Sequence, residues 1–170
     1  LEFRRVLFRS KMTAPKEIHV PGDISSAAFW LVAGSIIEDS DIILKDVGIN
    51  ETRTGIIDVL KAMGANIELL NVRDEVEPIA DIRVRYAKLH GTSFGADIMP
   101  RLIDEIPIIT VASMFAEGET IITGAGELRV KETDRLQVIT DEFNKVCPCI
   151  KGTQDGLIIT GSQRNNLQRS

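Results

Sequence analysis

The sequence predicts an α/β protein that is built from two tandem β-α-β-α-β-β units. Short apolar segments with strand character alternate with segments whose apolar residues recur at helical spacing. Residues 18–87 and residues 88–161 give this same order of predicted elements. Each unit is about 70 residues long, which exceeds the repeat length of solenoid proteins. We therefore expect two similar modules that pack against each other through their helices.

In the first unit, the apolar segment 24–37 predicts a buried helix, and Asp23 or one of the serines near the helix start is the expected cap. Residues 54–63 carry apolar side chains at helical spacing, and Gly64 is expected to end this second helix. A charged turn is expected before the last strand of the unit. The predicted strands are residues 17–20, 41–47, 65–70 and 81–86, and the turn is residues 73–78.

The second unit opens with a linking segment, residues 88–100, in which no clear element is predicted. A helix is expected at residues 105–115, where Pro107 is tolerated because it lies in the first turn. Another helix is expected at residues 133–146. The predicted strands are residues 119–123, 149–151 and 157–160, and the last two pair across a turn at 154–156.

Both ends of the chain are set apart from this fold. Residues 1–10 are basic and apolar without a signal-peptide core, and residues 6–10 resemble a translated sequencing adapter. We expect 1–10 to be non-native. No element is predicted for the tail 162–170, whose last two residues match the start of such an adapter. The chain is therefore expected to be a fragment of a longer protein.

Composition favours a globular protein and argues against several classes of partner. Apolar residues make up 44% of the 170 residues and charged residues 26%, which is enough for a substantial core. A net charge of −5 and an aromatic content of 5% argue against nucleic-acid binding. The most apolar run, residues 27–37, is shorter than the roughly 20 residues that span a bilayer.

The cysteines and histidines predict neither a disulfide nor a metal site. Cys147 and Cys149 are two residues apart, so in an extended segment their side chains point to opposite faces. The two histidines, His19 and His90, are far from them in sequence. We expect both thiols to be buried and structural, as in a reducing cytoplasm.

Residues 129–136 (RVKETDRL) are the segment that points to chemistry. They place three cations and two carboxylates within seven residues, directly after a glycine-containing turn. A helix that begins near Thr133 would bring Lys131 and Arg135 close together, and Glu132 beside them. Like charges at that spacing repel, but an anion bound between them at a helix N-terminus would remove the repulsion. The alternative from the residues alone is an ordinary helix start, capped by Thr133, with solvated charges.

This eight-residue string resembles the signature of the enolpyruvylshikimate-phosphate synthase family. The resemblance implies a fold of two domains, each assembled from β-α-β-α-β-β units as an inverse α/β-barrel with helices inside and sheets outside. Residues 18–161 would be two units of the C-terminal domain. Residues 21–27 and 50–55 also resemble family segments, with Glu51 where a proline is more usual. We interpret both as structural: a turn with a helix cap, and a capped helix start in which Arg53 is solvated.

The resemblance also assigns roles to four residues. Asp104 would contact the shikimate hydroxyls and accept a proton, although an N-cap before Pro107 is the structural alternative. Glu132 would be the second acid–base group, ionised in the empty site because cations flank it. Lys131 would bind shikimate 3-phosphate, and Arg135 would offer a planar fork to the phosphoenolpyruvate carboxylate or phosphate.

The activity implied is transfer of the enolpyruvyl group from phosphoenolpyruvate to the 5-hydroxyl of shikimate 3-phosphate, with release of phosphate. This is a step of the shikimate pathway to aromatic amino acids, and it would need no metal or organic cofactor. The resemblance implies a cytoplasmic enzyme that is a monomer when full length and has no nucleic-acid or membrane partner. The chain alone is expected to be inactive, because the family's N-terminal basic residues, its Ser-Ser-Gln segment and its later Arg and Lys have no counterpart here.

Two other functions compete with this interpretation. One is a relative that transfers enolpyruvyl to UDP-N-acetylglucosamine, which has the same architecture but lacks the Lys-Glu-Thr-Asp-Arg string. The other is a noncatalytic α/β binding module in which the charged segment is a solvated helix end. RNA-terminal phosphate cyclases share related fold units, but the acidic charge and low aromatic content do not favour them.

Overall fold

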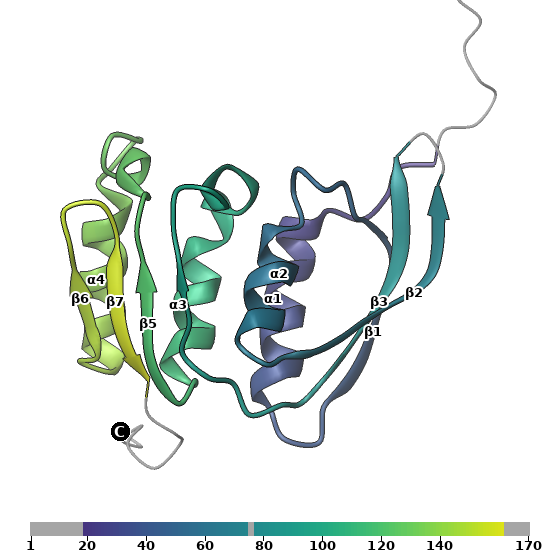
Figure 1. Cartoon of the computed structure of the whole chain (residues 1–170), viewed down its shortest axis with the longest axis horizontal. Coiled ribbons are helices and arrows are strands. Elements are labelled where there is room, and N and C mark those ends of the chain that lie inside the picture. Colours follow the sequence, from purple (N-terminus) through teal and green to yellow (C-terminus); the bar gives the residue numbers. More distant parts are fainter. Residues whose placement is uncertain (1–18, 75–76, 162–170) are drawn as a thin grey trace, which may run out of the picture.

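The computed structural model describes residues 19–74 and 77–161, and these residues form two successive α/β units (Figure 1). The segments 1–10 and 162–170 lie outside the described residues. The first unit contains α1 (Ile24–Ile36), β1 (Asp41–Gly48), α2 (Gly55–Ala62), β2 (Asn66–Asp74) and β3 (Pro78–Arg85). The second contains β4 (Ser93–Phe94), α3 (Ile106–Met114), β5 (Gly118–Ile122), α4 (Arg135–Val146), β6 (Ile150–Gly152) and β7 (Leu157–Gly161). Three short 3-10 helices also lie in the second unit: η1 (Met99–Arg101), η2 (Ile103–Glu105) and η3 (Gly126–Arg129).

The two sheets have the same strand arrangement, which confirms the predicted tandem architecture. The first sheet has the order β1-β3-β2 and the second the order β4-β5-β7-β6. The short β4 runs parallel to β5, and in the first unit a parallel bridge between Gly22 and Val47 takes the equivalent place beside β1. All other strand pairs in the two sheets are antiparallel.

The helices α1, α2 and α3 lie between the two sheets (Figure 1), and α1 contacts α3 across the boundary between the units. One apolar core runs through both units; its fully buried side chains include Leu31 of α1, Leu60 of α2 and Ile109 of α3. The fourth helix, α4, packs on β6. The expectation of helices inside and sheets outside therefore holds for α1, α2 and α3.

Several predicted bounds differ from the structure. Only residues 19 and 20 of the expected strand 17–20 are described, and they are not in a strand; the single bridge at Gly22 replaces it, since Pro21 has no amide hydrogen to extend a ladder. The turn expected at 73–78 is shorter, because β2 continues to Asp74 and β3 begins at Pro78. The linking segment 88–100 contains β4, which forms by long-range pairing with β5, and also the start of η1.

The cysteines are free thiols, as predicted, but both are half-buried rather than buried. They lie in the turn between α4 and β6, at the edge of the core. Burial and the neighbouring Cys147 raise the pKa of Cys149 to about 12. Within residues 19–74 and 77–161, no group of three or more His, Cys, Asp or Glu side chains is placed to hold a metal ion. No helix in the same residues is long and apolar enough to cross a membrane.

Asp81 is a buried carboxylate in the first sheet, and its partners predict how stability depends on pH. It accepts hydrogen bonds from Lys45 Nζ at 2.7 Å, Asn71 Nδ2 at 2.8 Å and the Asp46 amide at 3.1 Å. Lys45 and Asn71, with the Asp46 amide, hold the pKa of Asp81 far below its usual 3.8. The ionised form therefore stabilises the fold above the unfolded-state pKa, and that stabilisation is lost as the pH falls below it.

We expect Asp81→Asn to be less stable than the wild type at neutral pH. The difference in melting temperature should shrink as the pH is lowered below about 3.8, where the wild-type carboxylate starts to lose its advantage. Melting both proteins across this range by circular dichroism gives the comparison. Glu119→Gln, which changes an exposed carboxylate of β5, is the control for loss of charge. A constant difference between Asp81→Asn and the wild type at all pH values would contradict this account.

The turn that leads from β5 into residues 129–136 depends on one glycine. Gly124 has φ +71°, and a Cβ there would lie 2.7 Å from the Ala96 backbone. Its amide donates to the Asp155 carboxylate at 3.0 Å, which ties this turn to the β6–β7 turn. Gly126 is different, because a Cβ there would meet only the Asp155 side chain, at 3.9 Å.

Gly124→Ala is therefore expected to destabilise the fold by about 1–3 kcal/mol, the usual cost of a left-handed non-glycine residue, and the clash with Ala96 adds to it. Gly126→Ala, two residues further on, should change the free energy of unfolding little. Urea unfolding of the two variants measures the difference. Equal stability of the two would show that the Gly124 conformation is not required.

Candidate functional site

The charged segment 129–136 forms the end of η3, a turn and the start of α4. Asp134, and not the predicted Thr133, is the N-cap: its Oδ1 accepts from the Gln137 amide at 3.0 Å. An ionised carboxylate is a stronger acceptor than a hydroxyl, and it also complements the positive end of the helix dipole. The Gln137 amide and the Arg129 guanidinium lower the pKa of Asp134.

Arg129 braces this segment against the β6–β7 turn. Its Nη1 lies 2.5 Å from Asp134 Oδ2, and its Nε donates to the Gln154 carbonyl at 2.6 Å. A third hydrogen bond reaches the Thr153 carbonyl. Each nitrogen of the Arg129 guanidinium has a protein partner, so Arg129 holds the loop in place. This fixes the backbone next to Lys131 and Glu132.

Arg135 brings three of the four predicted site residues together. The Nη1 atom of Arg135 lies 3.8 Å from Asp104 Oδ1, and its Nη2 lies 3.0 Å from Glu132 Oε2. One guanidinium therefore lies between a carboxylate at the start of α3 and a carboxylate at the start of α4. All three side chains are accessible, with exposed fractions of 37% for Arg135, 61% for Asp104 and 76% for Glu132. An anion that approaches Arg135 has both carboxylates beside it.

Asp104 is not the capping residue of α3. It is the central residue of η2, and the N-cap position of α3 is Glu105, whose side chain makes no capping hydrogen bond. The structural alternative for Asp104 is thus not found. The Asp104 carboxylate instead pairs with Arg135, which is far away in sequence, so no local pattern predicts this contact.

The electrostatics of Glu132 favour its ionised form. A hydrogen bond from its own backbone amide lowers the pKa of Glu132, and the Arg135 guanidinium and the positive charge of Lys131 lower it further. This direction agrees with the expectation that Glu132 is ionised in the empty site. Lys131 is thus close enough to act on Glu132 electrostatically, while Asp104 and Arg135 form an ion pair at 3.8 Å.

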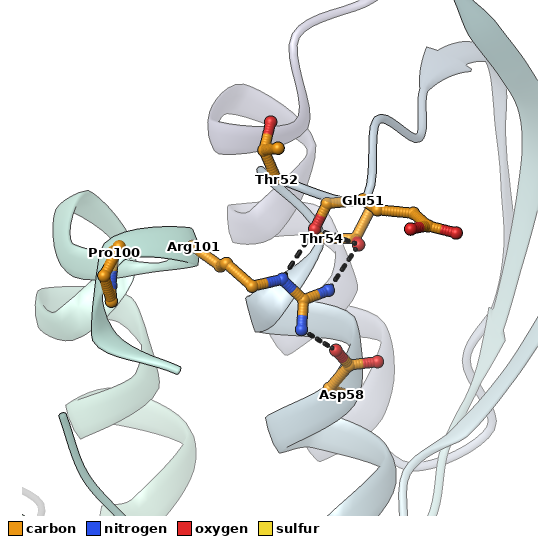
Figure 2. Close-up of a pocket in the computed structure, with 6 residues that line it drawn as sticks. All are labelled: Glu51, Thr52, Thr54, Asp58, Pro100 and Arg101. Atoms are coloured by element: carbon orange, nitrogen blue, oxygen red, sulfur yellow. Dashed lines mark hydrogen bonds and ion pairs between the residues drawn. The ribbon is translucent and has the colours of Figure 1, made fainter. Parts of the chain in front are cut away.

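An open pocket of about 710 Å³ lies at the boundary between the two units (Figure 2). Arg101 of η1 crosses the boundary: its Nε donates to the Glu51 carbonyl at 2.6 Å, its Nη2 to Thr54 Oγ1 at 3.0 Å, and its Nη1 pairs with Asp58 at 2.8 Å. Each of the three guanidinium nitrogens thus has a partner in the first unit. We conclude that Arg101 holds the two units together. None of the four predicted site residues is among the residues that line the pocket. The lining consists of Glu51, Thr52, Thr54, Asp58, Pro100 and Arg101.

The sequence did not indicate the role of Arg101, and the predictions for residues 21–27 and 50–55 were only partly correct. Asp23 caps α1 by accepting from the Ser26 amide at 2.9 Å, as predicted. Thr54 is at the N-cap of α2 but makes no capping hydrogen bond; its hydroxyl accepts from Arg101 instead. Arg53 is not simply solvated, since its Nη2 donates to Ser25 Oγ at 2.9 Å. None of these long-range partners has a signal in the local sequence.

The comparisons with known proteins agree with this architecture. The chain is 58% identical over 146 residues to 3-phosphoshikimate 1-carboxyvinyltransferase of Streptococcus thermophilus, which covers 86% of this chain and 34% of that protein. It is 55% identical over 157 residues to the protein of the same name in Gloeothece citriformis, covering 92% of this chain and 35% of the relative. The chain thus spans about a third of the length of the curated relatives that it matches.

Solved structures give the same result. EPSP synthase from Acinetobacter baumannii superposes with a TM-score of 0.80 at 47% identity, over 85% of this chain and 33% of that chain. The enolpyruvyl transferase NikO from Streptomyces tendae, at 18% identity and a TM-score of 0.52, shares the fold. The family model described as EPSP synthase (3-phosphoshikimate 1-carboxyvinyltransferase) matches residues 5–170. The chain therefore belongs to the EPSP synthase family.

Proposed function

We propose that the protein to which this chain belongs transfers the enolpyruvyl group of phosphoenolpyruvate to the 5-hydroxyl of shikimate 3-phosphate and releases phosphate. The observation that carries the proposal is the position of Arg135 between Asp104 and Glu132, at two adjacent helix starts, in a member of the EPSP synthase family. Both substrates are anions, and a guanidinium flanked by two carboxylates combines anion binding with proton transfer.

The chemistry requires an acceptor for one proton and a donor for another. The 5-hydroxyl oxygen bonds to C2 of phosphoenolpyruvate as it loses its proton, while C3 gains a proton. The tetrahedral product then loses phosphate from C2 and a proton from C3, which restores the enol. Asp104 is the proposed acceptor of the hydroxyl proton, and Glu132 the proposed group that exchanges the C3 proton.

The two cations have complementary tasks in this proposal. Arg135 presents its planar fork to the phosphoenolpyruvate carboxylate or phosphate, and Lys131 contacts the phosphate of shikimate 3-phosphate. The lowered pKa of Glu132 fits an empty site. Two entering anions would raise that pKa, and so let Glu132 take up the proton that the reaction needs.

The remaining contacts would come from parts of the relatives that lie beyond this chain, so we expect the chain alone to be inactive. A single-turnover assay that detects phosphate release by the chain alone, dependent on both substrates, would contradict this expectation. For the whole protein we propose the two small metabolites as substrates, no nucleic-acid partner, a monomeric state and a cytoplasmic location.

A chimera tests the proposed function. Residues 19–161 of this chain would replace the matching third of the Streptococcus thermophilus relative, to which it is 58% identical. Phosphate release that requires both phosphoenolpyruvate and shikimate 3-phosphate supports the proposal. A chimera that folds but releases no phosphate contradicts it and favours a noncatalytic module. Release with UDP-N-acetylglucosamine in place of shikimate 3-phosphate would favour the nucleotide-sugar relative.

A further inference from the structure

Glu105, the residue after Asp104, is a buried carboxylate with a partner in the other unit. Its exposed fraction is 3%. The Ser25 hydroxyl of α1 donates to Glu105 Oε1, and the same oxygen of Ser25 accepts from Arg53 Nη2 at 2.9 Å. A serine hydroxyl thus bridges a guanidinium and a carboxylate, and the bridge joins the starts of α1 and α2 to η2.

From this geometry we propose that the bridge of Arg53, Ser25 and Glu105 positions Asp104 against Arg135. The inference rests on the proposed function only for the catalytic consequence, since the contact itself exists in the chain. Arg101, three positions before Asp104, is bonded to the first unit, and so is Glu105, the residue directly after Asp104. The short segment between them carries the Asp104 carboxylate, so its direction is set from both sides.

A purely structural role would not favour a carboxylate at this position. Burying a carboxylate costs free energy unless it is paired, and a hydrophobic side chain of similar size in a core is often as stable or more so. The bridge spans 80 residues of sequence and joins two units at the turn that presents Asp104. Glu105 and Ser25 are positioning residues in this scheme, because they act on the reaction through Asp104.

The first test uses the chain itself and reads the Asp104–Arg135 contact directly. The Nε–H resonance of Arg135, assigned with Arg135→Lys, should shift in Asp104→Asn because the carboxylate beside the guanidinium loses its charge. Glu105→Leu should reproduce most of that shift, whereas Glu105→Gln, which still accepts from Ser25, should retain the wild-type position. An Arg135 resonance that is unchanged in Glu105→Leu overturns the inference, whether or not the proposed function holds.

The second test uses the chimera, if it is active, to separate positioning from stability. A displacement of about 1 Å at a catalytic group lowers turnover by up to roughly 100-fold, so Glu105→Leu should reduce kcat by about 10–100-fold well below its melting temperature. Glu105→Gln should restore most of the activity. In an Asp104→Asn background, Glu105→Leu should have little further effect, because its action passes through Asp104. Losses in kcat that multiply in the double variant overturn the inference.

Glu142→Gln is the matched control for both tests. Glu142 is an exposed carboxylate of α4 that pairs with Lys145 at 2.7 Å, on the same helix as Arg135. It should leave the Arg135 resonance and kcat unchanged. A chimera without activity refutes the proposed function, and the resonance test then still decides the positioning inference.

Discussion

Replacing Arg135 with alanine is expected to lower kcat/KM of the chimera by about 100- to 1,000-fold, the usual loss when one group that stabilises developing charge is removed. Arg135 forms ion pairs with both Asp104 and Glu132, so the change removes the proposed anion contact and the cation that the two carboxylates share. Steady-state phosphate release with both substrates measures kcat/KM of the variant relative to the unchanged chimera.

Two further variants decide whether charge or geometry is responsible. Arg135→Lys keeps the positive charge but loses the planar fork, so its activity should lie between that of alanine and the wild type. Lys145→Ala removes an exposed cation from the last turn of the same helix and should have little effect. If Arg135→Ala retains full turnover and the wild-type melting temperature, the guanidinium has no part in the site.

Replacing Asp104 with asparagine is expected to lower kcat of the chimera by about 100- to 10,000-fold, the range for loss of a general acid–base group. Asparagine has nearly the same shape, but its amide cannot accept the hydroxyl proton. The exposed side chain makes no capping bond to α3, so the fold should tolerate the change. Stopped-flow measurement of phosphate release separates the chemical step from product release.

The control for this variant is Asp141→Asn. Asp141 is an exposed residue of α4 that accepts from Gln137 Nε2 at 2.8 Å, and its loss should leave turnover near the wild-type value. A kcat for Asp104→Asn within a few-fold of the wild type would remove Asp104 from the proposed proton transfer. Lys131, Glu132 and Arg135 would then remain as the charged residues of a binding site.

The helices could be predicted from sequence because their signals are local. In α2 the apolar residues recur at helical spacing, and Gly64, at φ +91°, follows the last turn, as expected. The strand bounds were less accurate. In β3, polar and apolar residues alternate only from Asp81 to Arg85, so residues 78–80 carry no alternation that would mark the start of the strand at Pro78.

The candidate site was predictable only where the sequence carries a continuous motif. The string 129–136 indicated Lys131, Glu132 and Arg135, and family resemblance added Asp104. The contact between Asp104 and Arg135 depends on how α3 packs on β7 and α4 packs on β6. The Ser25–Glu105 bond joins residues from different units, and no spacing rule connects them.

The most direct measurement of the central claim is a crystal structure of the active chimera with both substrates or a nonreactive analogue of one. We predict that the Arg135 guanidinium contacts the carboxylate or phosphate of phosphoenolpyruvate, and that Asp104 lies within hydrogen-bond distance of a shikimate hydroxyl. Lys131 should reach the phosphate of shikimate 3-phosphate. Substrates bound at another surface, with Asp104 and Arg135 facing solvent, would contradict the account.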